Sequence, residues 1–358
     1  MSTTDPVLPG LALALNFDAI EALLRGKLVL AEGLAVVGGR VWRVRYEPGK
    51  SCSIIYRIEL EDQSSGARRQ EIITGKLLSR GENPAPIAHE LLEGYEKVPR
   101  RAICSPVIYL PEAYMVLYAF PLDPALPQLL DALDTAKVRE DLSAIGLEQG
   151  WQVNRIIGRE PARRSLAYIP ETRATLYYKV DASSAPGNEQ HQRGIVAKFY
   201  QDQDPAKVFG NMWAVWQAAE GRSVNLAGPI GYSQDLRLVF QEHIQGAPLS
   251  TFSESPIFSD LVEAAATGIA TIHSLELPLT RERTPEFEAR FIPRWADTVS
   301  AILPAQAAKI ERLKNRLTTE VYANTRPIAP IHGDFHPSNC LVREGRVNII
   351  DTDDVAWG

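Results

Sequence analysis

The sequence has few cysteines and no long hydrophobic run, and these absences exclude several classes of protein. Its three cysteines, Cys52, Cys104 and Cys340, lie far apart and form neither a CxxC pair nor a disulfide framework, which indicates a cytoplasmic location. No stretch approaches ~20 apolar residues, so no transmembrane helix is expected. The apolar run from Leu11 to Leu15 follows no basic residue, which is not the pattern of a signal peptide.

A strong excess of one charge is also lacking. The 358 residues carry a formal net charge of −6, which gives no bulk electrostatic reason for binding nucleic acid or a membrane. A composition of 45% hydrophobic and 23% charged residues is ordinary for a globular protein, and the length predicts two or three domains. We therefore expect neither nucleic acid nor membrane as a partner, and the sequence gives no signal for the oligomeric state.

The most informative segment is HGDFHPSN, from His332 to Asn339, with the residues that follow it. Two short apolar runs come next, joined by a polar turn that contains Gly345, and this pattern predicts a β-hairpin. A hairpin that leaves at Asn339 and returns at Asp351 brings these two residues together, with Asp334 a few residues upstream. Amide and carboxylate oxygens are the ligands that Mg²⁺ prefers.

The sequence also repeats itself at a spacing of about 120 residues, which is too long for the repeats of a solenoid. The matched pairs of segments begin at Asp5 and Asp123, Glu47 and Glu160, Ile73 and Ile195, and Pro106 and Pro229. Each unit is predicted to run helix, β-rich segments with a central Lys, second helix and strand pair. From about Ser250 the pattern becomes mainly helical, with helices predicted over 292–307 and 308–321 and an interruption at Pro304. The predicted regions are 1–122, 123–249 and 250–358.

A strand lysine, a helical lobe, a His-x-Asp loop, an Asn and a final Asp follow one another in the order typical of a kinase. The letters HGDFHPSN and IIDTDD resemble the aminoglycoside phosphotransferase and choline kinase-like family. The resemblance implies an α+β, protein kinase-like fold: an antiparallel-sheet nucleotide lobe (123–249) and a mainly helical catalytic lobe (250–358). Residues 1–122 would be a degenerate second copy of the nucleotide lobe.

The resemblance also implies a set of site residues for phosphate transfer to a hydroxyl of a small molecule, with ATP as donor, GTP as the alternative donor, and Mg²⁺. Asp334 would be the catalytic base, and Asn339 and Asp351 the metal ligands, with Asp353 as a further candidate. Lys198 would anchor the phosphates. The segment Gln241, Glu242 and His243 would form the hinge that meets the adenine. For Asp353 and Asp354, a solvated acidic pair or a helix N-cap stays an alternative, and His336 is interpreted as structural.

The sequence departs from the family pattern in two ways. The family pairs its Lys with a Glu on the next helix, but no Glu follows Lys198 before Glu220, and no GxGxxG loop is present. The chain also ends at Gly358, where the family continues, so a truncated catalytic lobe is expected. These departures support an alternative function, a catalytically inactive nucleotide-binding regulator. A metal-dependent phosphoesterase is disfavoured because the histidines of a two-metal site are missing.

Overall fold

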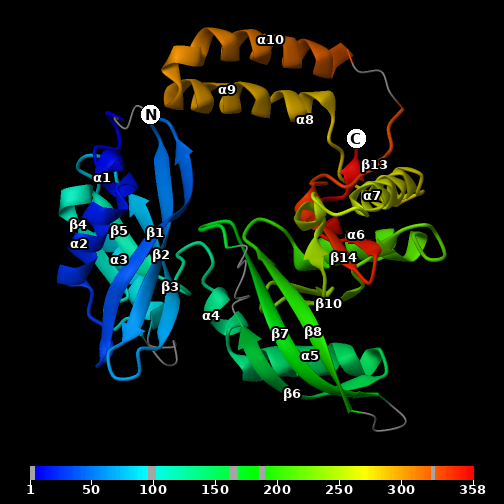
Figure 1. The fold of residues 1–358 in the computed structure, drawn as a ribbon, viewed down its shortest axis with the longest axis horizontal. Helices are drawn as coiled ribbons and strands as arrows, with labels where there is room; N and C mark the ends of the chain where they lie inside the picture. The colour runs from blue at the N-terminus through cyan, green and yellow to red at the C-terminus, as the bar shows by residue number, and fades with distance from the viewer. Residues whose placement is uncertain (1–4, 96–101, 161–167, 185–189, 324–326) are drawn as a thin grey trace. The chain divides into compact units, whose positions relative to one another are not determined.

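A computed structural model describes residues 5–95, 102–160, 168–184, 190–323 and 327–358 of the chain. The chain divides into two compact units, each built from two segments (Figure 1). One unit comprises Met1–Leu130 with Ala289–Val321, and the other comprises Asp131–Glu288 with Tyr322–Gly358. Part of the region predicted as the helical lobe therefore groups with the first unit, and the three predicted regions stay a prediction.

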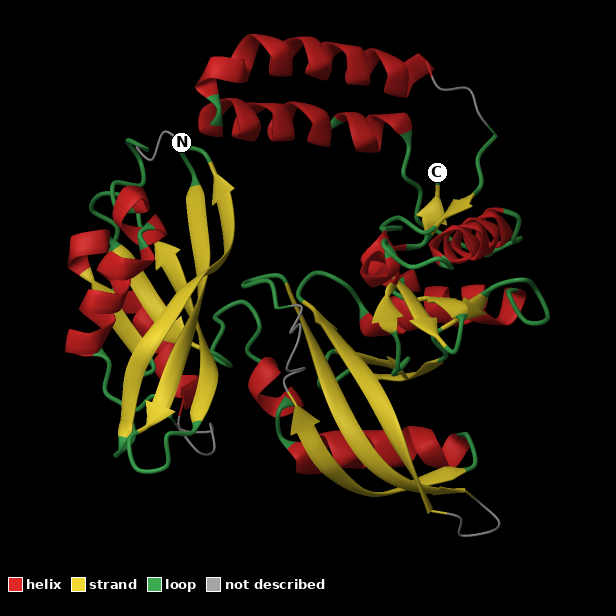
Figure 2. Ribbon diagram, in the orientation of Figure 1, coloured by secondary structure: helices red, strands yellow, loops and turns green. Residues whose placement is uncertain are grey.

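The first unit contains a five-stranded antiparallel sheet with helices against it (Figure 2). Its elements are α1 (Leu11–Leu15), α2 (Phe17–Lys27), β1 (Leu34–Glu47), β2 (Ser51–Asp62), β3 (Arg68–Leu77), α3 (Ala85–Tyr95), β4 (Val107–Leu110), η1 (Pro111–Ala113) and β5 (Met115–Ala119). The strand order is β1-β2-β3-β5-β4. Apolar side chains of α1 and α2, such as Leu11 and Leu24, share one buried core with Ile54 and Ile58 of β2.

An antiparallel pair of helices completes the first unit (Figure 1). These are α9 (Phe291–Ile302) and α10 (Ala307–Ala323), joined through the short 3₁₀ turn η3 (Pro304–Gln306). Pro304 ends the first helix because proline cannot continue its hydrogen-bond ladder. The sequence predicts this break at the same residue.

The second unit contains a second five-stranded antiparallel sheet, with the order β10-β11-β8-β7-β6. Its elements, with the helix that precedes them, are α4 (Leu129–Ala132), α5 (Thr135–Glu148), β6 (Trp151–Glu160), β7 (Arg173–Ser184), β8 (Gln190–Tyr200), α6 (Pro205–Ala218), β10 (Pro229–Ser233) and β11 (Leu238–Glu242). Counted along the chain, both sheets have the strand order 1-2-3-5-4, with a helix between their third and fourth strands. The third strand, β8, is central and carries Lys198.

The two sheets also share individual contacts at matching positions of the predicted repeat. In the first, the buried hydroxyl of Tyr56 donates a hydrogen bond to the Ala14 carbonyl at 2.7 Å. In the second, the buried hydroxyl of Tyr178 donates to the Ala132 carbonyl. Both tyrosines lie on the second strand of their sheet, and both alanines on a short helix before it. The internal duplication stays a prediction, which this common topology supports.

The remainder of the second unit carries the C-terminal motif. Its elements are β9 (Asn225–Leu226), β12 (Ala247–Pro248), η2 (Leu249–Phe252), α7 (Phe258–His273), α8 (Pro285–Ala289), β13 (Pro330–Ile331), η4 (Pro337–Asn339), β14 (Cys340–Arg343), β15 (Arg346–Ile349), η5 (Thr352–Asp354) and β16 (Ala356–Trp357). Helix α7 packs on the β14–β15 hairpin through a core that includes Leu261, Ile272, Cys340 and Ile349. The predicted α+β class is confirmed.

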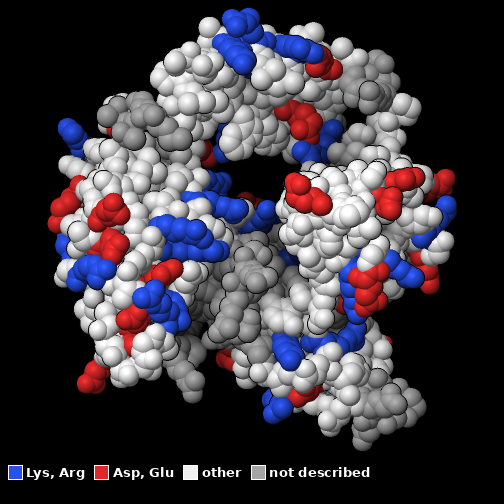
Figure 3. All heavy atoms as spheres, in the orientation of Figure 1, with Lys and Arg blue, Asp and Glu red and all other residues white. Residues whose placement is uncertain are grey.

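Two global properties bear on possible partners. Within the part of the chain that the structure describes, no helix combines the length and the apolar character needed to cross a membrane. On the face drawn in Figure 3, Lys and Arg side chains lie among Asp and Glu side chains in both units.

Candidate active site

The β14–β15 hairpin forms as the sequence predicts and brings two ligand candidates together. Its two-residue turn, Glu344-Gly345, has φ angles of 51° and 74°, and two positive φ angles are characteristic of a type I′ hairpin turn. Cys340 pairs with Ile349, and the Ile350 amide donates to the Asn339 carbonyl at 2.9 Å. Asn339 therefore lies beside the residue that precedes Asp351.

The loop before the hairpin is fixed by its backbone. Gly333 has φ +85°, and a Cβ at this position would lie 2.5 Å from the Asp354 carbonyl oxygen, so no larger residue fits without a shift. Arg283 Nη1 donates to the Gly333 carbonyl at 2.6 Å. The His332 ring is buried, with Nε2 at 2.9 Å from the Ile350 carbonyl oxygen. The loop and the end of the hairpin are thus bound to each other.

Burial lowers the pKa of His332, although its hydrogen bond to Ile350 and the nearby carboxylates oppose this shift. A neutral imidazole with Nε2–H donating to the Ile350 carbonyl leaves Nδ1 as an acceptor, and the Asp334 amide lies 3.4 Å from Nδ1. With these two contacts, His332 braces the loop against the end of the hairpin.

Asp334 and Asn339 are joined by a hydrogen bond of 2.9 Å from the Asn339 side-chain nitrogen to the Asp334 carbonyl. This bond uses the amide nitrogen and reserves the amide oxygen for another partner. The Asp334 side chain is half exposed and can reach a molecule in solvent. His336 caps η4 by accepting a hydrogen bond from the Ser338 amide, in agreement with its structural interpretation.

Lys198 lies at the centre of the site. Its Nζ is 2.7 Å from Asp351 Oδ1 and 2.5 Å from Asp353 Oδ1, although more than 150 residues separate it from both. The second carboxylate oxygen of Asp353 accepts a hydrogen bond from the Tyr200 hydroxyl. The side chains of Lys198 and Asp353 are 7% and 5% exposed, whereas that of Asp351 is 34% exposed. Asp351 thus faces solvent and Asp353 does not.

The charges of this cluster are mutually stabilised. Burial alone would lower the pKa of Lys198, but the charges of Asp353 and Asp351 outweigh it and raise the pKa. Burial alone would raise the pKa of Asp353, but the charge and hydrogen bond of Lys198 and the hydrogen bond of Tyr200 lower it. Burial and the Asp353 charge raise the pKa of Tyr200 well above its ordinary value. At neutral pH Lys198 is therefore an ammonium, Asp353 a carboxylate and Tyr200 a neutral phenol.

The two acids that flank Asp353 differ from it. Asp351 adopts a left-handed backbone conformation (φ 65°), which is uncommon outside glycine and clusters at functional sites. Asp354 forms an ion pair with Arg281 at 2.6 Å. The alternative of a solvated acidic pair at positions 353 and 354 therefore does not describe Asp353, whose carboxylate is buried.

The predicted hinge begins on β11, the strand beside β8. Gln241 pairs with Val196 and Val239 pairs with Lys198, so Gln241 and Lys198 lie on one face of the sheet because side chains alternate along a strand. Buried polar atoms without a hydrogen-bond partner among the described residues include Gln241 Oε1 and His243 Nδ1. Glu242 is exposed at the end of β11. Two hinge residues thus retain buried hydrogen-bonding capacity.

Sequence reasoning missed three residues that contact the loop or the acidic run around the site. Tyr200 lies two positions after Lys198 and therefore on the same face of β8, which the alternation of a strand could have indicated. Arg281 and Arg283 bind the loop and η5 from a segment after α7. Their only signal in the sequence is an Arg-Glu-Arg run, which does not specify a partner.

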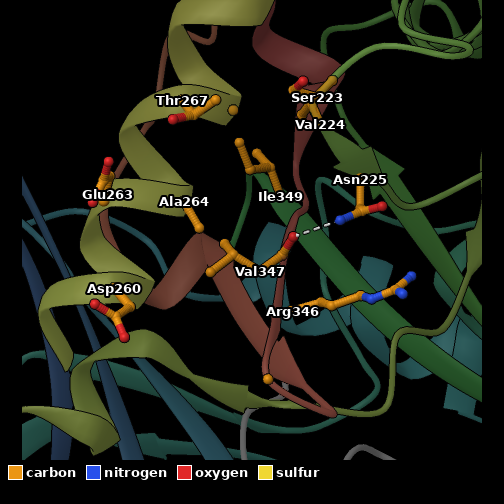
Figure 4. Close-up of a pocket in the computed structure, with 12 residues that line it drawn as sticks. Ser223, Val224, Asn225, Asp260, Glu263, Ala264, Thr267, Arg346, Val347 and Ile349 are labelled. Carbon is orange, nitrogen blue, oxygen red and sulfur yellow. Dashed lines mark hydrogen bonds between the residues drawn. The ribbon is translucent and has the colours of Figure 1, made fainter. Parts of the chain in front are cut away.

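A pocket of about 400 Å³ lies between α7 and the β15 strand (Figure 4). Its lining includes Asp260, Glu263 and Arg346, and the Asn225 side chain donates to the Val347 carbonyl at 3.2 Å at its edge. None of the predicted site residues lines it. The pocket is therefore separate from the Lys198 cluster.

The geometry, a strand lysine that meets an Asp beyond a hairpin, is that of a kinase-like phosphotransferase site. The model of a family described as the phosphotransferase enzyme family matches residues 188–358, a range that contains every predicted site residue. This match agrees with the family that the HGDFHPSN motif resembles, and it indicates a small-molecule kinase. No curated protein matches the chain in sequence.

Solved structures of aminoglycoside phosphotransferases are similar at a low level. The streptomycin–ATP complex of APH(2'')-IIa is 15% identical, covers 63% of this chain and 72% of its own, and has a TM-score of 0.38. A thermostable mutant of APH(4)-Ia with AMP-PNP and hygromycin B is 14% identical, covers 61% of this chain and 72% of its own, and has a TM-score of 0.40. Similarity at this level does not establish a common substrate.

Proposed function

We propose that the chain transfers the γ-phosphate of ATP to a hydroxyl group of a small molecule. The observation that carries this proposal is the contact of the Lys198 ammonium with Asp351, at the end of the hairpin that begins at Asn339. Lysine has three N–H donors, and two of them are engaged by Asp351 and Asp353, which leaves one for a phosphate oxygen. A cation that binds phosphate thus lies beside a carboxylate that can bind a metal.

The residues fit a nucleotide and Mg²⁺. When bound, Mg²⁺ would neutralise charge on the transferred phosphate. Asn339, through its amide oxygen, and Asp351, through its more exposed carboxylate, would hold it. No three His, Cys, Asp or Glu side chains form a metal-binding group among the described residues. This agrees with Mg²⁺ sites, which commonly use one or two protein ligands and complete the coordination with phosphate and water.

The hinge residues fit a nucleobase. Gln241 Oε1 is a buried acceptor without a partner among the described residues, and such atoms are uncommon in folded proteins. The adenine amine is a donor that could satisfy it. Guanine offers a carbonyl at the corresponding position, and a flip of the Gln241 amide would present its NH₂ group to that carbonyl, so both ATP and GTP fit this residue.

Asp334 is the base in this proposal. Its half-exposed carboxylate would accept the proton of the acceptor hydroxyl as the oxygen attacks the γ-phosphorus. The bond from that phosphorus to the bridging oxygen breaks, and ADP leaves. The hydrogen bond from Asn339 to the Asp334 carbonyl links the base to the metal site at a fixed distance along the loop.

A cytoplasmic location is proposed from the cysteines, which are free.

One observation favours the inactive, nucleotide-binding alternative. Helix α6 contains no Asp or Glu, so the family's ion pair between the strand lysine and a helix glutamate cannot form there. Both an active phosphotransferase and an inactive regulator would bind the nucleotide, but only the phosphotransferase would turn it over.

Steady-state ADP release with a panel of hydroxylated acceptors, including amino sugars and choline, separates them. We expect turnover with at least one acceptor, and a decrease of kcat by about 10²–10⁴-fold in Asp334→Asn, the typical contribution of a base. Asp334→Asn should still bind ATP. Unchanged turnover in this variant would show that Asp334 is not the base, and ATP binding without turnover on any acceptor would favour the inactive alternative.

A further inference from the structure

Lys198 is held in place although the helix glutamate is missing. Its described ion-pair partners are Asp351 and Asp353, both from the segment after the hairpin and neither from α6. A buried lysine without a fixed partner would be costly. Asp353 supplies this partner at 2.5 Å. It comes from the segment after the hairpin, whereas the family pattern uses the helix after the strand lysine.

We propose that Asp353 and Tyr200 are positioning residues that hold Lys198 toward the phosphates of the nucleotide, in the role that a helix glutamate has in related kinases. This inference rests on the proposed function. It replaces the role of metal ligand that the sequence suggests for Asp353. Asp351 and Asn339 then form the protein's share of the metal site.

Asp353 and Asp351 differ in their contacts and in their exposure, as expected if Asp353 positions Lys198 and Asp351 binds the metal. Both oxygens of Asp353 are engaged, Oδ1 by Lys198 and Oδ2 by Tyr200, and its side chain is 5% exposed. Metal ligation by Asp353 would have to bring a cation into this buried site, directly beside the Lys198 ammonium. Asp351 contacts Lys198 through Oδ1 and is 34% exposed, so a cation can reach it from the solvent side.

Tyr200 connects the acid to helix α6. Its ring packs in a buried cluster with Val208 and Met212 of the helix and with Val239 of the neighbouring strand. The hydroxyl at the far end of the ring donates to Asp353. The orientation of Asp353 is therefore fixed by a side chain that the helix and the sheet hold rigidly.

The helix also contacts the segment of Asp353 directly. Helix α6 packs against η5, and Val215 and Ala219 share a buried cluster with Val355. In kinases that use a helix glutamate, the ion pair reports the position of the helix to the strand lysine. Here apolar contacts would make η5 move together with the helix. A movement of η5 would shift Asp353, and Asp353 would shift Lys198. The missing glutamate is then no evidence for an inactive protein.

The test is the ATP affinity of the full chain, measured by calorimetry in Mg²⁺ and again in EDTA. A positioning residue acts on Lys198, which contacts phosphate with or without the metal. Asp353→Asn should therefore weaken ATP binding by about tenfold in both conditions, the effect expected of a hydrogen bond to a charged group. Asp351→Asn should abolish the increase of affinity that Mg²⁺ brings. Asp354→Asn, which alters a half-exposed ion pair next in sequence and leaves both partners of Lys198 in place, is the control and should bind ATP as the wild type does.

Two further variants separate a specific role from a general loss of structure. Tyr200→Phe removes one hydroxyl and keeps the packed ring, so it should fold and should weaken ATP binding in both conditions, by less than Asp353→Asn. Asp353→Asn should add no further loss to Lys198→Ala, because both act through the same ammonium. Circular dichroism and a melting curve of each variant establish that it is folded.

The outcomes are distinct. If Asp353→Asn loses only the Mg²⁺-dependent part of the affinity, as Asp351→Asn does, then Asp353 is a metal ligand and the inference is wrong. If the losses of Lys198→Ala and Asp353→Asn add, the two do not act together, and the inference is likewise wrong. A wild-type chain without affinity for ATP in either condition would overturn the proposed function and this inference with it.

Discussion

The adjacent acids Asp353 and Asp354 should differ strongly in their contributions to stability. Asp353→Asn keeps the shape of the side chain but leaves the buried ammonium of Lys198 with Asp351 as its described ion-pair partner. Loss of one partner of a buried ion pair typically costs about 3–5 kcal/mol. Because Asp351 remains at 2.7 Å, we expect the lower end, a decrease of about 3 kcal/mol in the free energy of unfolding.

Asp354→Asn is the matched control. Its ion pair with Arg281 has side chains 28% and 39% exposed, and exposed pairs contribute about 0–1 kcal/mol. Urea unfolding of both variants, followed by tryptophan fluorescence, measures the difference as a shift of the midpoint at constant slope. Equal decreases in the free energy of unfolding for the two variants, or a decrease of less than about 1 kcal/mol for Asp353→Asn, would refute the burial argument.

Three smaller predictions concern the loop and the predicted repeat. Gly333→Ala should lower the melting temperature, because it adds strain of about 1–3 kcal/mol at φ +85° and places a Cβ at 2.5 Å from the Asp354 carbonyl; an unchanged temperature would contradict this. His332 has a folded-state pKa below its ordinary value of 6.5, so its contribution is complete above pH 6.5 and is lost as the pH falls through the lower value. The unfolding free energy of the wild type should therefore fall more between pH 6.5 and 5 than that of His332→Gln, and parallel curves would contradict this. Tyr178→Phe leaves the Ala132 carbonyl without its buried donor and should cost about 1–3 kcal/mol in urea unfolding, whereas a neutral result would mean that the carbonyl finds another partner.

The hairpin could be predicted because its signals are local. The Glu344-Gly345 turn and the apolar runs on either side define the register, and the register places Asn339 beside the strand that leads to Asp351. The same holds for the break at Pro304, which follows from the chemistry of one residue.

The partners of Lys198 could not be derived from the sequence in the same way. Asp353 is 155 residues away, and its contact with Lys198 depends on tertiary packing, which includes that of α6 against η5. The carboxylate of Asp354 contacts Arg281 instead. From the sequence alone, the two acids are equivalent members of one acidic run. The same reason hides Arg283, whose partner is a backbone carbonyl and leaves no pattern of side chains.

The measurement that tests the central claim most directly is ³¹P NMR of ATP incubated with Mg²⁺, the chain and the acceptors. A phosphomonoester resonance should grow together with those of ADP, and it should be absent with Asp334→Asn. This result would establish transfer to a hydroxyl. Formation of inorganic phosphate alone, or equal phosphomonoester formation by Asp334→Asn, would contradict the account.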